Sequence, residues 1–323
     1  SLPTRRSRVR PPLPAPKLIV IKSKLITSIF QKILKDRDIQ SYKNKFFYYL
    51  VFRLIRNFLA NDLIISIYNF KLFGSIKKNK TSYFLLKKCE FGDYHELNTI
   101  KKFSNKNKLL FLDCGCNYGF YSMYTASLSK YNVIVSIEAS KNTSKEFLKN
   151  LKLNNFKNII FYNNAISDLD NTNISFNESE NDWESSQTHS NFKVNKVNNI
   201  KSITINSLLT SYNLEDYKVI IKLDIEGNEM NAIQGGLELI KKSSPIIIIE
   251  FSKYIFENKN NIDYLKNFLI NFDYSIYDTK IKKISLEDVL LKLNKLQKRY
   301  KTIGNFYLIK NLSDNLKIFL SNE

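Results

Sequence analysis

A short apolar run that ends in an aspartate and two spaced glycines constrains the fold of this chain most strongly. Residues 109–119 read Leu-Leu-Phe-Leu-Asp-Cys-Gly-Cys-Asn-Tyr-Gly, and a helix-compatible segment follows from Phe120 to Ala126. We interpret these residues as a buried strand, a tight turn and a helix, the first half of a nucleotide-binding βαβ unit. Glycines let the backbone of such a turn pass close to a ligand.

The glycine spacing indicates which ligand the turn binds. A dinucleotide-binding turn has the pattern G-x-G-x-x-G, whereas Gly115 and Gly119 stand here in D-x-G-x-x-x-G. No Lys or Arg occurs between Lys108 and Lys130, so the turn offers no cationic side chain to a phosphate. An acidic turn of this kind suits a positively charged ligand, such as the sulfonium and amino group of S-adenosylmethionine.

A second predicted strand, residues 132–138, ends in Glu138, 25 residues after Asp113. A carboxylate at this distance is placed to accept the ribose hydroxyls of an adenosine. A third predicted strand, residues 158–162, leads into a turn that lies against the adenine in such folds, and this turn contains Asn163, Asn164 and Ala165. The alternative interpretation is that Asp113 and Glu138 only end their strands.

A second acidic motif follows the apolar run at residues 219–223 and reads Asp-Ile-Glu-Gly-Asn-Glu, from Asp224 to Glu229. Another continuous apolar run ends at Glu250, as expected for a strand buried on both faces of a parallel sheet. Ligands of open α/β sheets bind at the carboxyl ends of the strands, so these acids are candidate site residues. The alternative is that Glu226 and Glu229 complement a helix N-terminus.

The motifs at 111–119 and 222–229 resemble those of the FkbM-type methyltransferases, a branch of the class I S-adenosylmethionine-dependent enzymes. Further similar pieces are residues 92–97, 150–154, 164–168 and 248–251, so the resemblance covers about residues 90 to 251. It implies an α/β fold with a Rossmann-like, seven-stranded, mostly parallel sheet, helices on both faces and an antiparallel last strand. Members of this family commonly O-methylate sugars or secondary metabolites, often in glycan biosynthesis.

The resemblance also implies roles for particular residues. S-adenosyl-L-methionine is the expected cofactor. Its expected binding residues are Asp113, Gly115 and Gly119 for the methionine end, Glu138 for the ribose, and Asn164 and Ala165 for the adenine rim, with Asn117 as a further binding residue in the turn. The expected catalytic residues, on the acceptor side, are Asp224, Glu226 and Glu250. We predict no metal ligand set, because two histidines and three cysteines give no metal-binding pattern; a metal that bridges Asp224 and Glu226 is the open alternative.

Composition divides the chain into segments. Residues 1–16 hold five of the six prolines and are expected to be a non-native or disordered tail. Residues 17–88 are expected to form a basic, mainly helical extension, since most of the net charge of +20 lies before residue 89. Residues 89–311 form the predicted catalytic domain, and residues 312–323 a C-terminal tail.

The expected partner is a small-molecule or glycan acceptor, and no nucleic acid is expected. Peripheral membrane contact through the basic extension is an open alternative. Low cysteine usage and charges in every apolar stretch favour a cytoplasmic location. A nucleic-acid methyltransferase remains an alternative, although Pro245 is the only proline after residue 16 and an Asn/Asp-Pro-Pro-aromatic motif is therefore absent. Two further interpretations are an NAD-dependent dehydrogenase and a non-catalytic, membrane-attached protein that retains the fold.

Overall fold

The structure is a computed structural model, and it describes residues 17–20, 63–74, 93–179, 194–296 and 302–320. The chain divides into two units, residues 1–92 and residues 93–323. The first unit contains a three-stranded antiparallel sheet of β1 (Lys17–Val20), β2 (Leu63–Ile67) and β3 (Phe70–Gly74). The tail 1–16 and most of the basic extension lie outside the described residues.

The mainly helical character expected for residues 17–88 is wrong for the part that the structure describes. Strands β2 and β3 form a hairpin around Tyr68 and Asn69, and Ile67 pairs with Phe70. Ile65, Ile67, Phe70 and Leu72 are buried, while residues between them are more exposed. This alternation has the period of a strand. The lysine-rich, apolar composition of the segment had favoured a helix instead.

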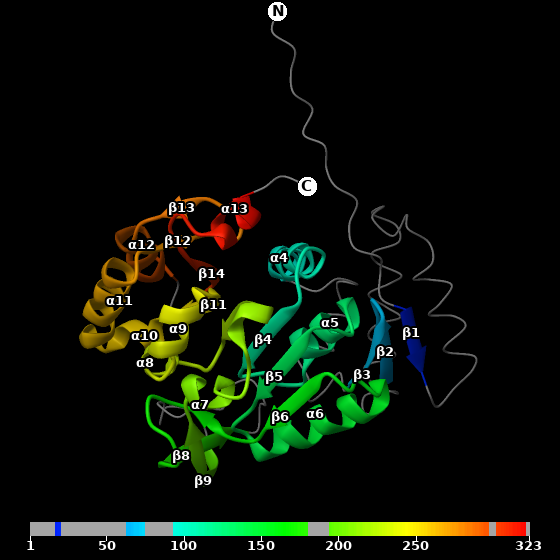
Figure 1. Ribbon diagram of the computed structural model, residues 1–323. Helices are drawn as coiled ribbons and strands as arrows, with labels where there is room; N and C mark the ends of the chain where they lie inside the picture. Colours follow the sequence, from blue (N-terminus) through cyan, green and yellow to red (C-terminus); the bar gives the residue numbers. More distant parts are fainter. Residues whose placement is uncertain (1–16, 21–62, 75–92, 180–193, 297–301, 321–323) are drawn as a thin grey trace, which may run out of the picture. The chain divides into compact units, whose positions relative to one another are not determined.

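The second unit is built around an eight-stranded sheet with the order β13-β12-β14-β11-β10-β4-β5-β6 (Figure 1). Strands β4, β5, β6, β10 and β11 are parallel, and β14 runs antiparallel between β11 and β12. The predicted seven-stranded, mostly parallel sheet with an antiparallel last strand is therefore confirmed, and the two-residue β13 adds an eighth strand. The bounds are β4 Leu109–Cys114, β5 Val133–Ile137, β6 Ile159–Tyr162, β10 Lys218–Leu223, β11 Ile246–Ser252, β12 Tyr274–Tyr277, β13 Lys283–Ile284 and β14 Thr302–Lys310.

Side chains alternate along each strand, so the two faces of the sheet pack against different sets of helices. Leu110, Leu112 and Cys114 of β4 belong to a large apolar core formed with the helices that follow β9, β10, β11 and β13. These helices are α7 (Ile205–Leu209), α8 (Glu229–Gln234), α9 (Leu237–Ser243), α10 (Lys253–Glu257), α11 (Lys259–Asn271) and α12 (Leu286–Asn294). The 3₁₀ helix η2 (Leu214–Asp216) leads into β10.

The opposite face carries α4 (Tyr94–Ser104), α5 (Phe120–Leu128), α6 (Lys141–Asn154) and α13 (Asp314–Leu320). Helix α5 follows the glycine turn directly, and the ring of Phe147 from α6 stacks on Phe161 of β6. Because both faces are covered, the central strands are apolar along almost their whole length.

The C-terminal residues do not form the expected tail. Phe319 of α13 is buried and packs edge-on against Tyr277 and Tyr307, and its carbonyl oxygen accepts a hydrogen bond from Lys102. The side chain of Asn315 also donates to the carbonyl of Ser244. The catalytic domain therefore extends at least to Leu320, because α13 completes the packing beside β14.

A second, three-stranded sheet follows β6 in the chain order. It consists of β7 (Ala165–Ile166), β9 (Val194–Ile203) and β8 (Asn173–Ser179), in that order. The loop between β8 and β9, residues 180–193, lies outside the described residues. Among the described residues, no helix is long and apolar enough to cross a bilayer.

Candidate active site

The glycine turn between β4 and α5 is fixed by close contacts with the protein itself. Gly115 and Gly119 have φ angles of 80° and 85°, which favour glycine. A Cβ atom on Gly115 would lie 1.9 Å from the carbonyl oxygen of Asp224, and one on Gly119 would lie 2.7 Å from the ring of Phe147. Packing in this turn thus requires glycine at both positions.

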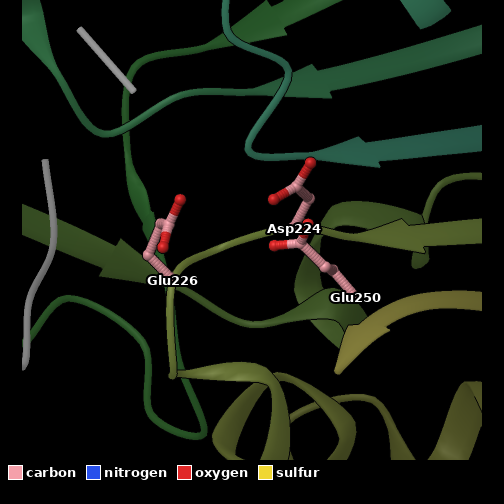
Figure 2. A group of neighbouring side chains, drawn as sticks. All are labelled: Asp224, Glu226 and Glu250. Carbon is pink, nitrogen blue, oxygen red and sulfur yellow. The ribbon is translucent and has the colours of Figure 1, made fainter. Parts of the chain in front are cut away.

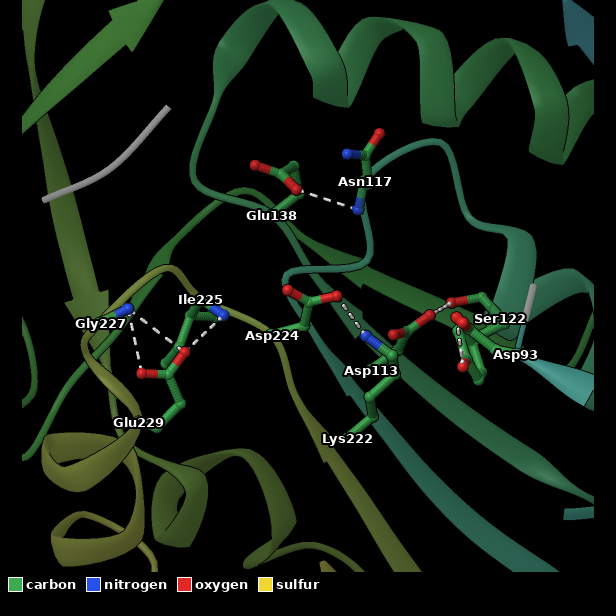
Figure 3. A network of polar contacts seen from close by, with 11 residues as sticks. Asp93, Asp113, Asn117, Ser122, Glu138, Lys222, Asp224, Ile225, Gly227 and Glu229 are labelled. Carbon is green, nitrogen blue, oxygen red and sulfur yellow. Dashed lines mark hydrogen bonds and ion pairs between the residues drawn. The ribbon is translucent and has the colours of Figure 1, made fainter. Parts of the chain in front are cut away.

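Glu138, at the end of β5, connects two loops at the rim of this turn (Figure 3). Its carboxylate accepts hydrogen bonds from the backbone N–H of Asn117, at 3.0 Å, and of Ser140, at 2.8 Å. Burial raises the pKa of Glu138 to about 7. The carboxylate therefore orders the turn, and each of its oxygens keeps a lone pair for a further donor.

Asn117 has a positive φ of 51°, a conformation that asparagine tolerates better than most residues. Its side-chain Oδ1 is buried and has no hydrogen-bond partner among the described residues. An unsatisfied buried acceptor is costly, so its presence beside Glu138 points to a ligand that donates a hydrogen bond here.

Asp113 lies deeper than the other predicted site residues. It follows Leu109 and Phe111 on the α5 side of β4, and it is only 1% exposed. Its carboxylate accepts a 2.5 Å hydrogen bond from Ser122 of α5, and Ser122 also contacts Ser136 of β5. Burial raises the pKa of Asp113. Asp113 therefore links β4 to α5 beneath the glycine turn. Its contact with the methionine end of the cofactor stays a prediction.

The two neighbouring asparagines at the predicted adenine rim bond to different parts of the backbone. Asn163 donates to the carbonyl of Glu138, at 2.7 Å, and so holds the loop after β5 in place. The side chain of Asn164 donates to the carbonyl of Lys201, at 3.0 Å. Ala165 is buried in β7, so only its backbone is available for a contact with a ligand. Sequence reasoning missed the structural role of Asn163.

The three predicted catalytic acids come together at the carboxyl ends of two adjacent strands (Figure 2). Asp224 and Glu226 follow β10, Glu250 belongs to β11, and one carboxylate oxygen from each lies within 4.8 Å of the others. Burial and the charge of Asp224 raise the pKa of Glu250. Carboxyl groups at this spacing are able to share a proton or to bind a hard cation.

Glu229 holds the loop that carries two of these acids. It is 1% exposed, and its carboxylate accepts the backbone N–H groups of Ile225 and Gly227 at 3.0–3.3 Å (Figure 3). Glu226 and Gly227 adopt φ angles of 54° and 108°, which turn the chain sharply into α8. The interpretation of Glu229 as an acid at the start of a helix agrees with this geometry. The side chain of Asp224, in contrast, accepts a hydrogen bond from Lys222.

Lys222 is a site residue that sequence reasoning missed, although it stands two residues before Asp224. Its ammonium lies 2.7 Å from Oδ2 of Asp224 and 4.8 Å from the centre of the Tyr121 ring. The hydroxyl of Tyr121 in turn donates to Asp93 at the start of α4, at 2.8 Å. A charged residue inside the apolar run 219–223 is the signal that could have found it.

A parallel sheet with a glycine turn, a carboxylate at the end of the second strand and further acids after the fourth and fifth defines a class of α/β enzymes with adenosine-containing cofactors. The particular family follows from comparison: residues 113–276, slightly more than half of the chain, match the methyltransferase FkbM domain. The chain belongs to the FkbM methyltransferase family, and its cofactor is S-adenosylmethionine.

Solved structures include similar chains, all at low identity. A methyltransferase FkbM from Methylobacillus flagellatus KT is 17% identical over 71% of this chain and 52% of its own, with a TM-score of 0.39. An rRNA methylase from Streptococcus thermophilus is 11% identical over 68% of this chain and 97% of its own, with a TM-score of 0.38. This chain thus spans about half the length of the Methylobacillus flagellatus protein. No curated protein matches the chain.

The residues at the turn fit the cofactor. Asn117 Oδ1 lacks a donor among the described residues, and Glu138 retains acceptor capacity beside it, as a ribose with two hydroxyls requires. The nearby carboxylates of Asp113 and Asp224 suit the cationic methionine end. When bound, the cofactor supplies a methyl group that its sulfonium already activates for transfer.

Proposed function

We propose that the protein is an O-methyltransferase that acts on a hydroxyl group of a sugar or glycan. The observation that carries this proposal is the convergence of Asp224, Glu226 and Glu250 within 4.8 Å, beside the glycine turn. A hydroxyl acceptor has to lose its proton during transfer, and a carboxylate within hydrogen-bond reach can take it. The remaining contribution of the enzyme is the alignment of acceptor oxygen and methyl group.

The charge of the site supports a neutral, hydroxyl-rich acceptor over a nucleic acid. Asp93, just before α4, and Glu96 of α4 add two carboxyls to the side of the site where Lys222 lies, and both feel the charge of Lys222. The ammonium of Lys222 is 3% exposed and paired with Asp224, so it does not neutralise a phosphate backbone, whereas sugar hydroxyls donate hydrogen bonds to carboxylates. The expected partner is therefore a small-molecule or glycan acceptor.

The test is transfer of a tritiated methyl group from S-adenosylmethionine to a panel of monosaccharides, nucleotide sugars, oligosaccharides, phenols and RNA. We expect product with a sugar-containing acceptor and a 10²–10⁴-fold lower single-turnover rate for Asp224→Asn, the range for a positioned acid–base group. Affinity for S-adenosylhomocysteine should change far less, since the adenosine contacts come from Glu138. The exposed Asp263 of α11 provides the matched control, Asp263→Asn.

Two outcomes would contradict the proposal. Methylation of RNA alone would support the nucleic-acid alternative. A full turnover rate for Asp224→Asn with a lowered melting temperature would mean that this acid acts only on stability.

A further inference from the structure

Lys222 occupies a position where a charge is costly. It lies in β10, in the middle of the sheet, and its backbone is in register with Asp113 of β4 and Ile248 of β11. Its side chain is 3% exposed. A buried ammonium is tolerated only when carboxylates and other polar groups compensate for its lost hydration, so its surroundings indicate its role.

The ammonium contacts its neighbours on two sides. Oδ2 of Asp224 accepts its hydrogen bond at 2.7 Å, and the Tyr121 ring lies under it at 4.8 Å. Four further carboxyl groups interact with it through their charge: Asp93 just before α4, Glu96 of α4, Asp113 of β4 and Glu250 of β11. These four act on the ammonium through their charge, whereas Asp224 accepts its hydrogen bond and is its specific partner among the described residues.

Asp224 is also held through its backbone. Its N–H donates to the carbonyl of Cys114, at 3.1 Å, and its own carbonyl oxygen is the atom that packs against Gly115. Its side chain is 37% exposed, in contrast to that of Lys222. The glycine turn thus fixes the main chain of this residue, and Lys222 fixes one oxygen of its carboxylate, which leaves the other oxygen to face a ligand.

We propose that Lys222 is a positioning residue for methyl transfer: it holds the Asp224 carboxylate at the angle at which its second oxygen meets the acceptor hydroxyl. This inference rests on the proposed function, because it assigns Lys222 a role through Asp224. The competing role is structural, in which Lys222 only compensates the buried charge of Asp113. The two roles differ in whether the effect of Lys222 depends on Asp224.

A double-mutant cycle with Lys222→Met and Asp224→Asn separates these roles. Single-turnover rates at saturating tritiated S-adenosylmethionine, with the sugar acceptor found above, are measured for the four proteins. Misplacement of a reacting group by about 1 Å can cost 10²-fold, so we expect Lys222→Met to lower the rate by about that factor. In the Asp224→Asn background the same change should lower the rate less than about threefold, because residues that act as one unit are not additive.

Additional measurements distinguish positioning from damage to the fold. The Kd for S-adenosylhomocysteine should stay within about threefold of the wild-type value in both single variants. Asp263→Asn, at the exposed position of α11 used above, is the control, and its turnover should stay near that of the wild type. If Lys222→Met does not fold, Lys222→Arg takes its place in the cycle, since it retains the charge but changes the angle of the bond.

The outcomes are separable from those of the proposed function. Equal effects of Lys222→Met with and without Asp224 would overturn the positioning role while the enzyme itself remains active. A wild-type protein that binds S-adenosylmethionine but methylates no acceptor in the panel would overturn the proposed function, and the positioning role with it.

Discussion

The carbonyl oxygen of Asp224 occupies the space that a side chain on Gly115 would need. A Cβ atom at that position would lie 1.9 Å from the oxygen, which is far below van der Waals contact. The glycine turn and the loop that carries two acids are therefore in direct contact. A disturbance of one displaces the other.

We expect Gly115→Ala to destabilise the protein by about 2–5 kcal/mol, because left-handed strain and overpacking act together. Affinity for S-adenosylhomocysteine should fall as well. The measurements are the free energy of unfolding in urea and a calorimetric titration. Gly304→Ala is the control: its φ is 92°, but a Cβ there meets nothing within 4 Å among the described residues, so only strain applies. Equal effects at both positions would contradict the contact with Asp224.

The second prediction concerns Glu138. Its replacement by Ala removes the acceptor of two backbone N–H groups and of the expected ribose hydroxyls. Loss of hydrogen bonds to a charged group costs about 1.5–3 kcal/mol, so the Kd for S-adenosylhomocysteine should rise at least tenfold. Glu138→Gln keeps one acceptor oxygen, and its Kd should lie between those of the wild type and Glu138→Ala. An unchanged Kd in both variants would mean that the ribose lies elsewhere.

The third prediction is a fall in stability as pH rises. Burial raises the pKa of Glu96, Glu138 and Glu229 to about 7, from 4.5 in the unfolded chain. Between these values the native protein binds more protons than the unfolded protein, so its stability is largest below pH 4.5 for these groups and declines toward pH 7. The decline is at most about 1.4 kcal/mol per pH unit for each group.

Urea denaturation of the cofactor-free protein at pH 5.5, 6.5 and 7.5 measures this decline. Glu229→Gln removes one titrating group. The slope of the free energy of unfolding against pH should therefore decrease by the contribution of that one group. A free energy of unfolding that increases from pH 5.5 to 7.5 would show that the buried glutamates are ionised in the folded protein.

The fourth prediction concerns the choice of cofactor. The sequence offers no cation in the glycine turn, and the second acidic loop lies against it. Calorimetric titration should therefore detect S-adenosylhomocysteine binding at concentrations where NAD gives no signal. Tighter binding of NAD would remove the basis for the assignment of Glu138, Asn117 and Asp224.

Sequence reasoning located the elements of the catalytic unit well, because strand ends in a parallel sheet carry a simple signal. An apolar run followed by Asp or Glu marks the end of β4, β5, β10 and β11, and parallel pairing brings these ends together. The convergence of Asp224 and Glu250 follows from that pairing alone. The N-terminal hairpin was wrongly expected to be helical, since its period-two burial spans only four buried positions.

What the sequence did not reveal is the direction of side chains. Asp113 and Asp224 both follow apolar runs, yet one lies beneath α5 and the other reaches toward solvent. Asp113 still belongs to the pleated strand β4, whereas Asp224 follows the end of β10. A sequence pattern does not locate the end of a strand to within one residue. The partnership of Lys222 with Asp224 depends on the same detail.

The position of β14 between β11 and β12 has a consequence for how the protein is made. The ribosome produces β11 and β12 before the strand that joins them, and Ile247, Ile248 and Ile249 of β11 pair with residues 306–308. The nascent chain thus exposes an apolar, unpaired edge until β14 has left the exit tunnel. Glu250 pairs with Asn305 in the same step, so the acidic site takes its shape only when synthesis has reached the last strand.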